Sequence, residues 1–359
     1  MKNTLSIAVT GLACFLTFSD LASASPLPRQ RIPADAKWLF HADLVGFRAS
    51  QIGHYVQTNF LSGPLKEVSS NLKFDAEALL RTVTSVTAYG SDFKKNDPEA
   101  SLTTGVLILQ TDAETQQIVE GALAAQLLAN TNSPLKKLQT QPYPLYAVGK
   151  DLFGAIQPDG VILLGKSRER IDQATQVLEG KLPSLLGGKA FTDFPATSDS
   201  FVFLGVAEGF DQLLELPPQA KVLHMADGLR IVLGENADVL FADLALKSKT
   251  QEVVTQIQQV LQGLIALFSL GAPENQDLSE LVRSTKVTTA DKVVAVGMQF
   301  PVAKALALIA KGGQQDSDTP KPERKSSKPG KKRSKHHEEP EIQPEATTSQ
   351  KPEPKAEAK

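Results

Sequence analysis

The residues best suited to chemistry near the start of the globular sequence are His41 and Asp43, which alternate along the apolar run WLFHAD at 38–43. Such a run predicts a β-strand, and alternate residues of a strand lie on the same face. A histidine beside a carboxylate could serve as an oriented general base or contribute to a metal site. The sequence identifies no third partner, so a strand face partly open to water explains the pair equally well.

A second candidate is a literal match to the phosphate-binding pattern GxxxxGKS at residues 160–167. A phosphate-binding loop places its apolar strand before the first glycine, which leaves the loop backbone free to wrap the phosphate. Here the four residues between Gly160 and Gly165 are apolar, so they form the strand themselves. We therefore interpret the match as a β-strand that runs into a helix N-terminus, and we predict neither nucleotide nor any other cofactor.

Other motifs of common enzymes, namely GxSxG, HExxH and paired CxxC, are absent from the sequence. Their absence removes the easily recognised classes of enzyme and leaves open a site assembled from scattered residues. The string HHEE at 336–339 could hold a divalent metal weakly, but in a polar tail it is better explained as solvated charge. We predict no metal site.

A strongly basic segment lies near the C-terminus, where residues 321–335 contain eight basic side chains against Glu323 alone. Such a segment attracts polyanions such as anionic lipid or an acidic envelope polymer. It carries no aromatic residue on which bases could stack, which does not favour nucleic acid. A solubilising tail is the alternative. The candidate polyanion-binding residues are Lys321, Arg324, Lys325, Lys328, Lys331, Lys332, Arg333 and Lys335.

The N-terminus predicts export from the cytoplasm. Lys2 precedes a short apolar run that ends near Phe18, and a small-x-small site follows at Ala22-Ser23-Ala24. These features are typical of a secretory signal peptide, with cleavage predicted after Ala24. The apolar run is too short to span a bilayer comfortably. We therefore expect a periplasmic or extracellular protein, and we expect no transmembrane span in the mature chain.

Composition sets the expected class of structure. The chain has 359 residues, of which 41% are hydrophobic, and Cys14 in the predicted signal peptide is its only cysteine. A mature protein without cysteine has no disulfide and relies on burial of apolar surface for stability. Beyond residue 312, Pro, Lys, Glu, Ser and Gln dominate, a composition that cannot bury enough apolar surface to fold.

The order of the expected elements predicts an α+β fold of two tandem modules. Each reads as a strand, a β-hairpin with a helix, and a further strand with a helix, which favours mainly antiparallel sheet with helices on one face. Residues 201–210 can be laid over residues 38–47, so the modules are candidate duplicates. The predicted segments are a signal peptide at 1–24, a first module at 25–185, a second module at 198–312 and a disordered charged tail at 313–359.

Residues 32–43, IPADAKWLFHAD, and the repeated α+β layout carry a resemblance to uncharacterised exported proteins of Planctomycetes- and Verrucomicrobia-like bacteria. The resemblance covers residues 32–311. It implies an exported protein whose function is not established, and it transfers no functional residue.

These observations favour an exported, non-catalytic envelope protein that acts by binding or scaffolding, with an unidentified envelope partner or polyanion. The alternative is an exported hydrolase with a scattered polar site near His41 and Asp43. A deep polar pocket around these two residues would favour the hydrolase, whereas an apolar groove would favour binding.

Overall fold

The computed structural model describes residues 26–63, 66, 78, 81–93, 104–129, 135–194, 201–209, 225–271 and 276–315. The predicted signal peptide and the basic segment at 321–335 lie outside these ranges. The elements of the first half are η1 (Arg29–Arg31), β1 (Trp38–Asp43), α2 (Leu44–Ala49), α3 (Gln51–Val56), the π-helical turn η2 (Gln57–Leu61), β2 (Ser85–Gly90), β3 (Val106–Gln110), α7 (Ala113–Ala129), β4 (Leu135–Gln139), β5 (Leu145–Val148), β6 (Leu152–Gln157), β7 (Val161–Gly165) and α8 (Arg168–Leu178).

The second half contains five strands and three helices among the described residues. They are β8 (Phe201–Glu208), β9 (Gly228–Asn236), β10 (Val239–Lys247), α9 (Gln251–Gly271), α10 (Gln276–Ser284), β11 (Lys286–Ala290), β12 (Val293–Pro301) and α11 (Val302–Gln315).

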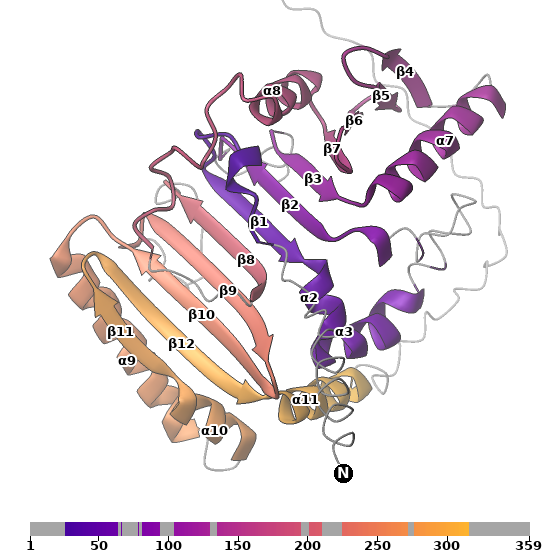
Figure 1. Ribbon diagram of the computed structural model, residues 1–359. Helices are drawn as coiled ribbons and strands as arrows, with labels where there is room; N and C mark the ends of the chain where they lie inside the picture. Colours follow the sequence, from indigo (N-terminus) through magenta and orange to yellow (C-terminus); the bar gives the residue numbers. More distant parts are fainter. Residues whose placement is uncertain are drawn as a thin grey trace, which may run out of the picture. The chain divides into compact units, whose positions relative to one another are not determined.

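All twelve described strands join one antiparallel sheet in the order β11-β12-β10-β9-β8-β1-β2-β3-β7-β6-β5-β4 (Figure 1). The predicted α+β class with antiparallel sheet is therefore confirmed. No break in the sheet separates the two halves, because β1 of the first half pairs directly with β8 of the second half.

The two halves repeat one arrangement outward from the β1–β8 pair. On one side the sheet order is β1-β2-β3-β7-β6, and on the other it is β8-β9-β10-β12-β11. In sequence, α7 follows β3 as α9 follows β10, and α8 follows β7 as α11 follows β12. The first half adds β4 and β5 at its edge, and the second half adds α10.

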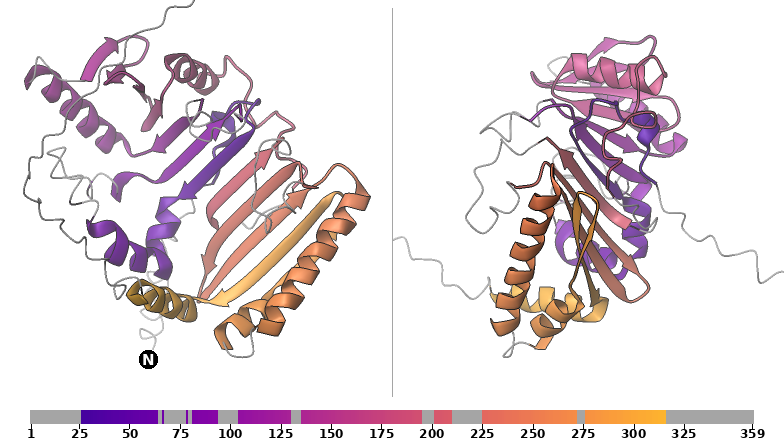
Figure 2. Two further views of the ribbon diagram at one scale, coloured as in Figure 1. Left: turned by 180° about the vertical axis from the view of Figure 1, so that it is seen from behind. Right: turned by 90° about the vertical axis from the view of Figure 1, so that its left-hand side faces the viewer.

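Helices cover both faces of the sheet, which differs from the one-sided arrangement expected from the sequence. On β6, Ala155 belongs to the core cluster that includes Ile171 of α8, whereas Ile156 belongs to the cluster under α7. Successive residues of a strand point to opposite faces, so α7 and α8 lie on opposite faces. On β10, Leu246 packs in a cluster with α9, and α9 lies along one face of the sheet in Figure 2 (right).

The segment after α8 is rich in Gly and Pro, yet it is part of the core. Leu185 is fully buried, and Phe191 and Phe194 are almost so. These side chains share one cluster with Leu39 of β1 and Val206 of β8. The segment therefore covers the centre of the sheet where the two halves meet.

Candidate functional site

The described residues form an apolar cavity of about 640 Å³ on one face of the sheet. Its floor comes from β1, β8, β9, β10 and β12, and its walls come from α2, α3 and α10. Its volume lies within the range of small-molecule sites, which are mostly apolar and concave. The side chains that give the cavity its apolar character are Phe47, Phe203, Leu233, Leu240, Met298 and Phe300.

Strand alternation explains why these residues line one surface. Leu240 and Ala242 of β10 are two residues apart, as are Met298 and Phe300 of β12, so each pair shares a face. Ala242 pairs with Met298 across these strands. Ala42 and Ala242 place small side chains on the floor between larger ones, and the space that they leave is part of the cavity.

The wall made by α2 and α3 is fixed by helix capping. Asp43 Oδ1 accepts hydrogen bonds from the amides of Val45 and Gly46 at the start of α2. Ser50 Oγ accepts from the amide of Gly53 at the start of α3. Carboxylate and hydroxyl oxygens satisfy the amides that a helix N-terminus leaves without intrahelical partners.

Glu235 attaches α3 to the β9–β10 hairpin. Its carboxylate oxygens accept from the amides of Gln51 at 2.8 Å and Ile52 at 3.1 Å. The side-chain amide of Gln51 also donates to Asp238 at 2.9 Å. The negative carboxylate therefore meets the positive end of a short helix, and this contact holds one wall of the cavity against its floor.

The polar side chains in the cavity lining are thus already engaged. Glu235 holds two amides of α3, and the Ser50 hydroxyl also donates to the carbonyl of Phe47 at 2.8 Å. Hydrogen-bonding capacity for a polar ligand group inside this cavity is therefore small. The surface suits hydrocarbon.

An exposed aromatic strip continues from the cavity toward the centre of the sheet. The ring of Phe40 stacks on that of Phe203 with centroids 6.1 Å apart, although Phe40 is 47% exposed. Gly205, the partner of Phe40 across the strands, lies directly beneath the Phe40 ring. A Cβ atom there would lie 3.2 Å from the ring, so glycine gives the aromatic side chain room to lie flat.

His41 and Asp43, the pair singled out from the sequence, are buried on the face of β1 opposite the cavity. His41 is fully buried, and its Nδ1 atom lies 2.8 Å from Thr87 Oγ1 on β2. Asp43 is 1% exposed and caps α2, while its Oδ2 atom has no hydrogen-bond partner among the described residues. Ala42 between them lines the cavity. The structure therefore places the pair in the core, on the face of the sheet away from the cavity.

The GxxxxGKS match forms the strand and helix start predicted from its apolar spacing. Residues 161–165 form β7, and Ser167 Oγ accepts from the amide of Arg170 as the N-cap of α8. The strand lies where a phosphate-binding loop would need free backbone amides. This match therefore has an ordinary structural explanation.

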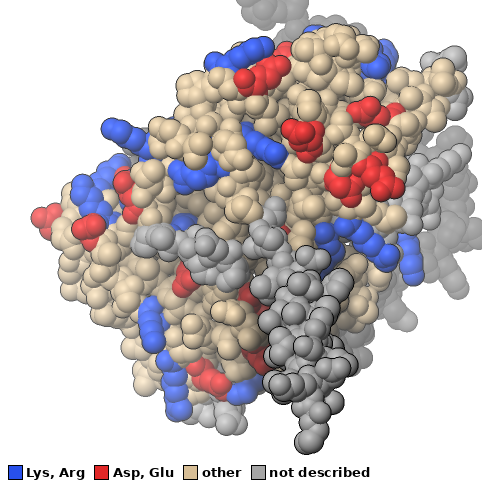
Figure 3. Space-filling view, viewed as in Figure 1, with Lys and Arg blue, Asp and Glu red and all other residues tan. Residues whose placement is uncertain are grey.

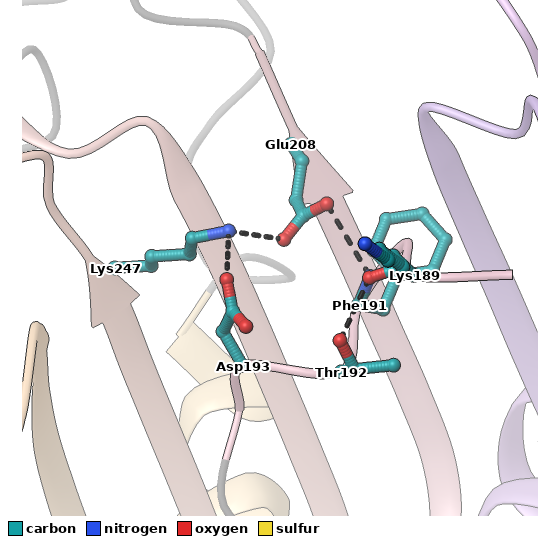
Figure 4. Close-up of polar contacts among 6 residues, drawn as sticks. All are labelled: Lys189, Phe191, Thr192, Asp193, Glu208 and Lys247. Carbon is teal, nitrogen blue, oxygen red and sulfur yellow. Dashed lines mark hydrogen bonds and ion pairs between the residues drawn. The ribbon is translucent and has the colours of Figure 1, made fainter.

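A polar cluster beside the sheet connects residues 185–194, the segment after α8, to the second half (Figure 4). Lys247 Nζ of β10 lies 2.6 Å from Asp193 Oδ2 and 2.9 Å from Glu208 Oε1 of β8. The other Glu208 oxygen accepts from the amide of Phe191 at 3.3 Å. Burial opposes the charge on Lys247, but the hydrogen bonds and charges of Asp193 and Glu208 outweigh it and raise the pKa of this ammonium group. These contacts hold the segment after α8 against β8 and β10.

Charge on the face shown in Figure 3 does not single out a polyanion site. In Figure 3, basic and acidic side chains are interspersed over the face shown, without a broad patch of one sign among the described residues. Within the described ranges, no group of three His, Cys, Asp or Glu side chains could hold a metal ion. The predicted polyanion-binding residues 321–335 lie outside those ranges, so that hypothesis stays a prediction.

Sequence reasoning missed the cavity. Its residues come from strands and helices spread between positions 42 and 300. The available signal was the apolar alternation of β10 and β12 together with the small residues Ala42 and Ala242. Ordinary core strands show the same signal, and only the tertiary arrangement distinguishes strands that line a cavity from strands that are fully packed.

Comparisons with known proteins leave the family open. No family model and no curated protein matches this sequence. One similar solved structure is described as "Structure of crystal form I of TP0453", a Treponema protein. The match has a TM-score of 0.39 and 10% sequence identity, and it covers 80% of this chain and 98% of that chain.

Proposed function

We propose that this chain is an exported, non-catalytic envelope protein that binds the hydrocarbon chain of an amphiphilic ligand such as a fatty acid or phospholipid. The apolar cavity of about 640 Å³ is the observation that carries the proposal. Transfer of a hydrocarbon chain from water into such a cavity is favourable by about 0.8 kcal/mol for each buried CH₂ group. An acyl chain therefore provides enough apolar surface for stable binding.

The engaged polar groups favour this class of ligand over a polar metabolite. Glu235 and Ser50 already use their oxygens on α3 and on the α2–α3 turn. A sugar or nucleotide would bury hydroxyl or amide groups there without partners, which costs about 1–3 kcal/mol for each group. The polar headgroup of the ligand therefore stays outside, beside the exposed Phe40–Phe203 strip.

The N-terminal sequence and the repeated topology support two further parts of the proposal. Lys2, the apolar run and the Ala22-Ser23-Ala24 site support export with cleavage after Ala24. The matching sheet orders β1-β2-β3-β7-β6 and β8-β9-β10-β12-β11 support an internal duplication of one α+β module. A secreted carrier of this kind would meet its ligand in the envelope, where lipid chains are abundant.

A displacement assay tests the proposal directly. The full chain should enhance the fluorescence of cis-parinaric acid, and palmitate should displace the probe. Ala242→Phe adds a ring to the cavity floor and should weaken probe binding by about tenfold or more, because filled space excludes the chain. Ala42→Phe provides a second, independent cavity-filling variant.

The matched control is Ala147→Phe on β5, which adds the same ring at a half-buried strand alanine outside the cavity lining and away from the Phe40–Phe203 strip. It should bind the probe as the wild type does, and thermal melting should show that all three variants are folded. Failure of palmitate to displace the probe, or equal affinity of Ala242→Phe and wild type, would show that the cavity is not the binding site.

A further inference from the structure

A second, smaller cavity lies on the face of the sheet opposite the apolar cavity, and we call it the Tyr89 cavity. It has a volume of about 270 Å³ and is bounded by the loop before β1, the ends of β2 and β3, and α8 with the segment that follows it. Tyr89 of β2 pairs across the strands with Leu39 of β1. Leu39 and Ala42 are three residues apart on one strand, so they point to opposite faces. The two cavities are therefore separate.

Backbone hydrogen bonds fix one wall of the Tyr89 cavity. The amide of Ala34 donates to the carbonyl of Pro183 at 3.0 Å, and the amide of Leu185 donates to the carbonyl of Ile32 at 2.8 Å. These bonds join the loop before β1 to the segment after α8, and the side chains of Ile32 and Leu185 are fully buried in the core. A wall held in this way is formed before a ligand arrives, which lowers the cost of binding.

The Tyr89 cavity contains a buried phenol that is not satisfied by the protein. Tyr89 is 4% exposed, and its hydroxyl has no hydrogen-bond partner among the described residues. Buried hydroxyl groups are normally hydrogen-bonded, because leaving one without a partner is unfavourable. Burial raises the pKa of this phenol, so the group keeps its proton at neutral pH. Tyr89 therefore offers a hydrogen-bond donor to an occupant of the cavity.

Helix α8 brings a positive charge to the cavity. Arg170, Gln173 and Val177 recur at helical spacing, and all three line it. Arg170 Nη1 donates to Gln173 Oε1 at 3.0 Å, which orients the guanidinium group. The other guanidinium nitrogen atoms form no hydrogen bond within the described ranges. Arg170 therefore retains donors for a carboxylate, the group that a guanidinium binds best in proteins.

A negative charge lies at the rim of the same cavity. Asp35, in the loop before β1, is exposed and belongs to the lining. Its charge raises the pKa of Tyr89, and the charge of Arg170 lowers it, so both groups act on the phenol. The ion pairs of the described residues do not join Asp35 to Arg170. The cavity therefore presents two opposite charges and a neutral donor to one small volume.

The remaining surface and the volume limit the size of the ligand. Aliphatic side chains supply much of the lining, namely those of Pro33, Val106, Val177, Leu182 and Pro183. Such a surface favours burial of a short aliphatic group. The volume of about 270 Å³ lies just below the range of roughly 300–1,000 Å³ that is typical of small-molecule sites. It suits one small molecule and is too small for a peptide or a long acyl chain.

One class of ligand matches all of these groups. We propose that the Tyr89 cavity binds a free amino acid with an aliphatic side chain, whose carboxylate meets Arg170 and Tyr89 and whose ammonium group meets Asp35. A simple anion would be repelled by Asp35, and a simple cation would be repelled by Arg170. A zwitterion satisfies both charges. This inference goes beyond the proposed function, because it concerns another cavity, on the other face of the sheet, and another kind of ligand.

Isothermal titration calorimetry of the full chain with L-leucine tests the proposal. Leucine should bind saturably with one site per chain. Isocaproate lacks the ammonium group of leucine, and isoamylamine lacks its carboxylate. Each should bind at least about tenfold more weakly than leucine, because one charge of the cavity then has no counterpart. Absence of saturable leucine binding would overturn the proposal, and so would equal affinity for leucine and isocaproate.

Two variants with matched controls locate the bound leucine. Tyr89→Phe removes the donor and keeps the ring, and Arg170→Gln removes the positive charge. Each should weaken leucine binding by about tenfold or more. Tyr146→Phe changes another buried tyrosine, and Arg168→Gln changes another arginine of α8, both outside the lining. These controls should bind leucine as the wild type does, and thermal melting should show that all four variants are folded. Controls that lose as much affinity as Tyr89→Phe and Arg170→Gln would place leucine elsewhere and contradict the proposal.

A third variant tests the pairing of charges. Asp35→Asn should weaken leucine binding and strengthen isocaproate binding, because the repulsion of a simple anion is removed. An equal effect of this variant on both ligands would contradict the assigned orientation. Ala242→Phe, which fills the apolar cavity, should bind leucine as the wild type does, and leucine should not displace cis-parinaric acid. The two assays therefore fail independently, and failure of one proposal does not imply failure of the other.

Discussion

His41 of β1 lies directly opposite Leu204 of β8, at the point where the two halves of the sheet meet. Laying residues 201–210 over residues 38–47 places the same two residues at equivalent positions of the two halves. If the two halves arose by duplication, a two-fold arrangement of β1 and β8 would bring one such matching pair face to face. At this position of the core, β1 carries the polar residue His41 and β8 carries the apolar residue Leu204.

Replacing His41 by leucine tests how the core uses this histidine. His41→Leu leaves the buried Thr87 hydroxyl without its ring partner and should lower the free energy of unfolding by about 1–3 kcal/mol. His41→Leu/Thr87→Val removes both partners and should recover part of that loss. Urea denaturation measures both variants.

The His41→Leu variant also tests the alternative hypothesis that this protein is a hydrolase with a site near His41. Binding of cis-parinaric acid should be unchanged, because His41 lies on the face of β1 opposite the cavity. A hydrolytic activity of the wild type that disappears in folded His41→Leu would instead support the alternative.

Regular elements and their class could be predicted from apolar periodicity, whereas the exact helix caps could not. Thr111 and Asp112 both precede the first long helix, and it is Asp112 that accepts from the amide of Thr115. Thr111 is engaged by Gly160 of the neighbouring hairpin through its amide and its hydroxyl. Likewise Thr250, and not Ser248, accepts from Val253 at the start of α9. Adjacent residues of similar chemistry compete, and tertiary contacts decide between them.

The continuous sheet and the cavity could not be predicted in the same way. Pairing of β1 with β8 joins strands more than 150 residues apart, and no local pattern encodes that choice. Alanine is common at ordinary core positions. Ala42 and Ala242 line a cavity only because larger residues surround them. Buried aromatics such as Phe191 also turn a Gly- and Pro-rich segment into part of the core.

Gly53→Ala should displace the cavity wall. A Cβ atom at this position would lie 1.6 Å from the carbonyl oxygen of Phe47, a contact that the turn between α2 and α3 cannot relieve without moving. We expect a loss of more than about 2 kcal/mol in unfolding free energy, measured by urea denaturation, together with weaker binding of cis-parinaric acid. Gly63→Ala is the matched control, since nothing lies within 4 Å of its Cβ position. Equal stability of the two variants would contradict the close packing of α2 on α3.

The Lys247 cluster should contribute to stability at neutral pH and lose its effect in alkali. The pKa of Lys247 is raised above 10.5 in the folded protein, so the contribution is fully present below that unfolded value and is lost as the pH rises through the folded value. Lys247→Met should be less stable than wild type at pH 7, and the difference should shrink above about pH 10.5. Denaturation curves at pH 7 to 11.5 measure it. A constant difference over this range would show that packing, and not charge, accounts for the effect.

Tyr89 should add a second alkaline dependence of the same sign. Burial, with a smaller effect of Asp35, raises the pKa of its phenol, so folding is disfavoured once the pH exceeds the unfolded value of about 10. The hydroxyl has no hydrogen-bond partner among the described residues. Tyr89→Phe should therefore keep or raise stability at pH 7 and lose less of it by pH 11. A Tyr89→Phe protein destabilised by more than about 1 kcal/mol at pH 7 would indicate a hydrogen bond to this hydroxyl.

The basic segment at 321–335 should attach the protein to anionic lipid surfaces through its charge. Contacts between its eight basic side chains and anionic headgroups release counterions, so affinity should fall steeply with salt. We therefore expect a chain truncated after Gln315, the last residue of α11, to lose the salt-dependent part of its binding to phosphatidylglycerol vesicles. Deleting only residues 338–359, which are mainly acidic, should strengthen binding to phosphatidylglycerol at low salt. Identical salt dependence of the full chain and the truncated chain would mean that the segment does not contact the lipid surface and serves only to keep the protein soluble.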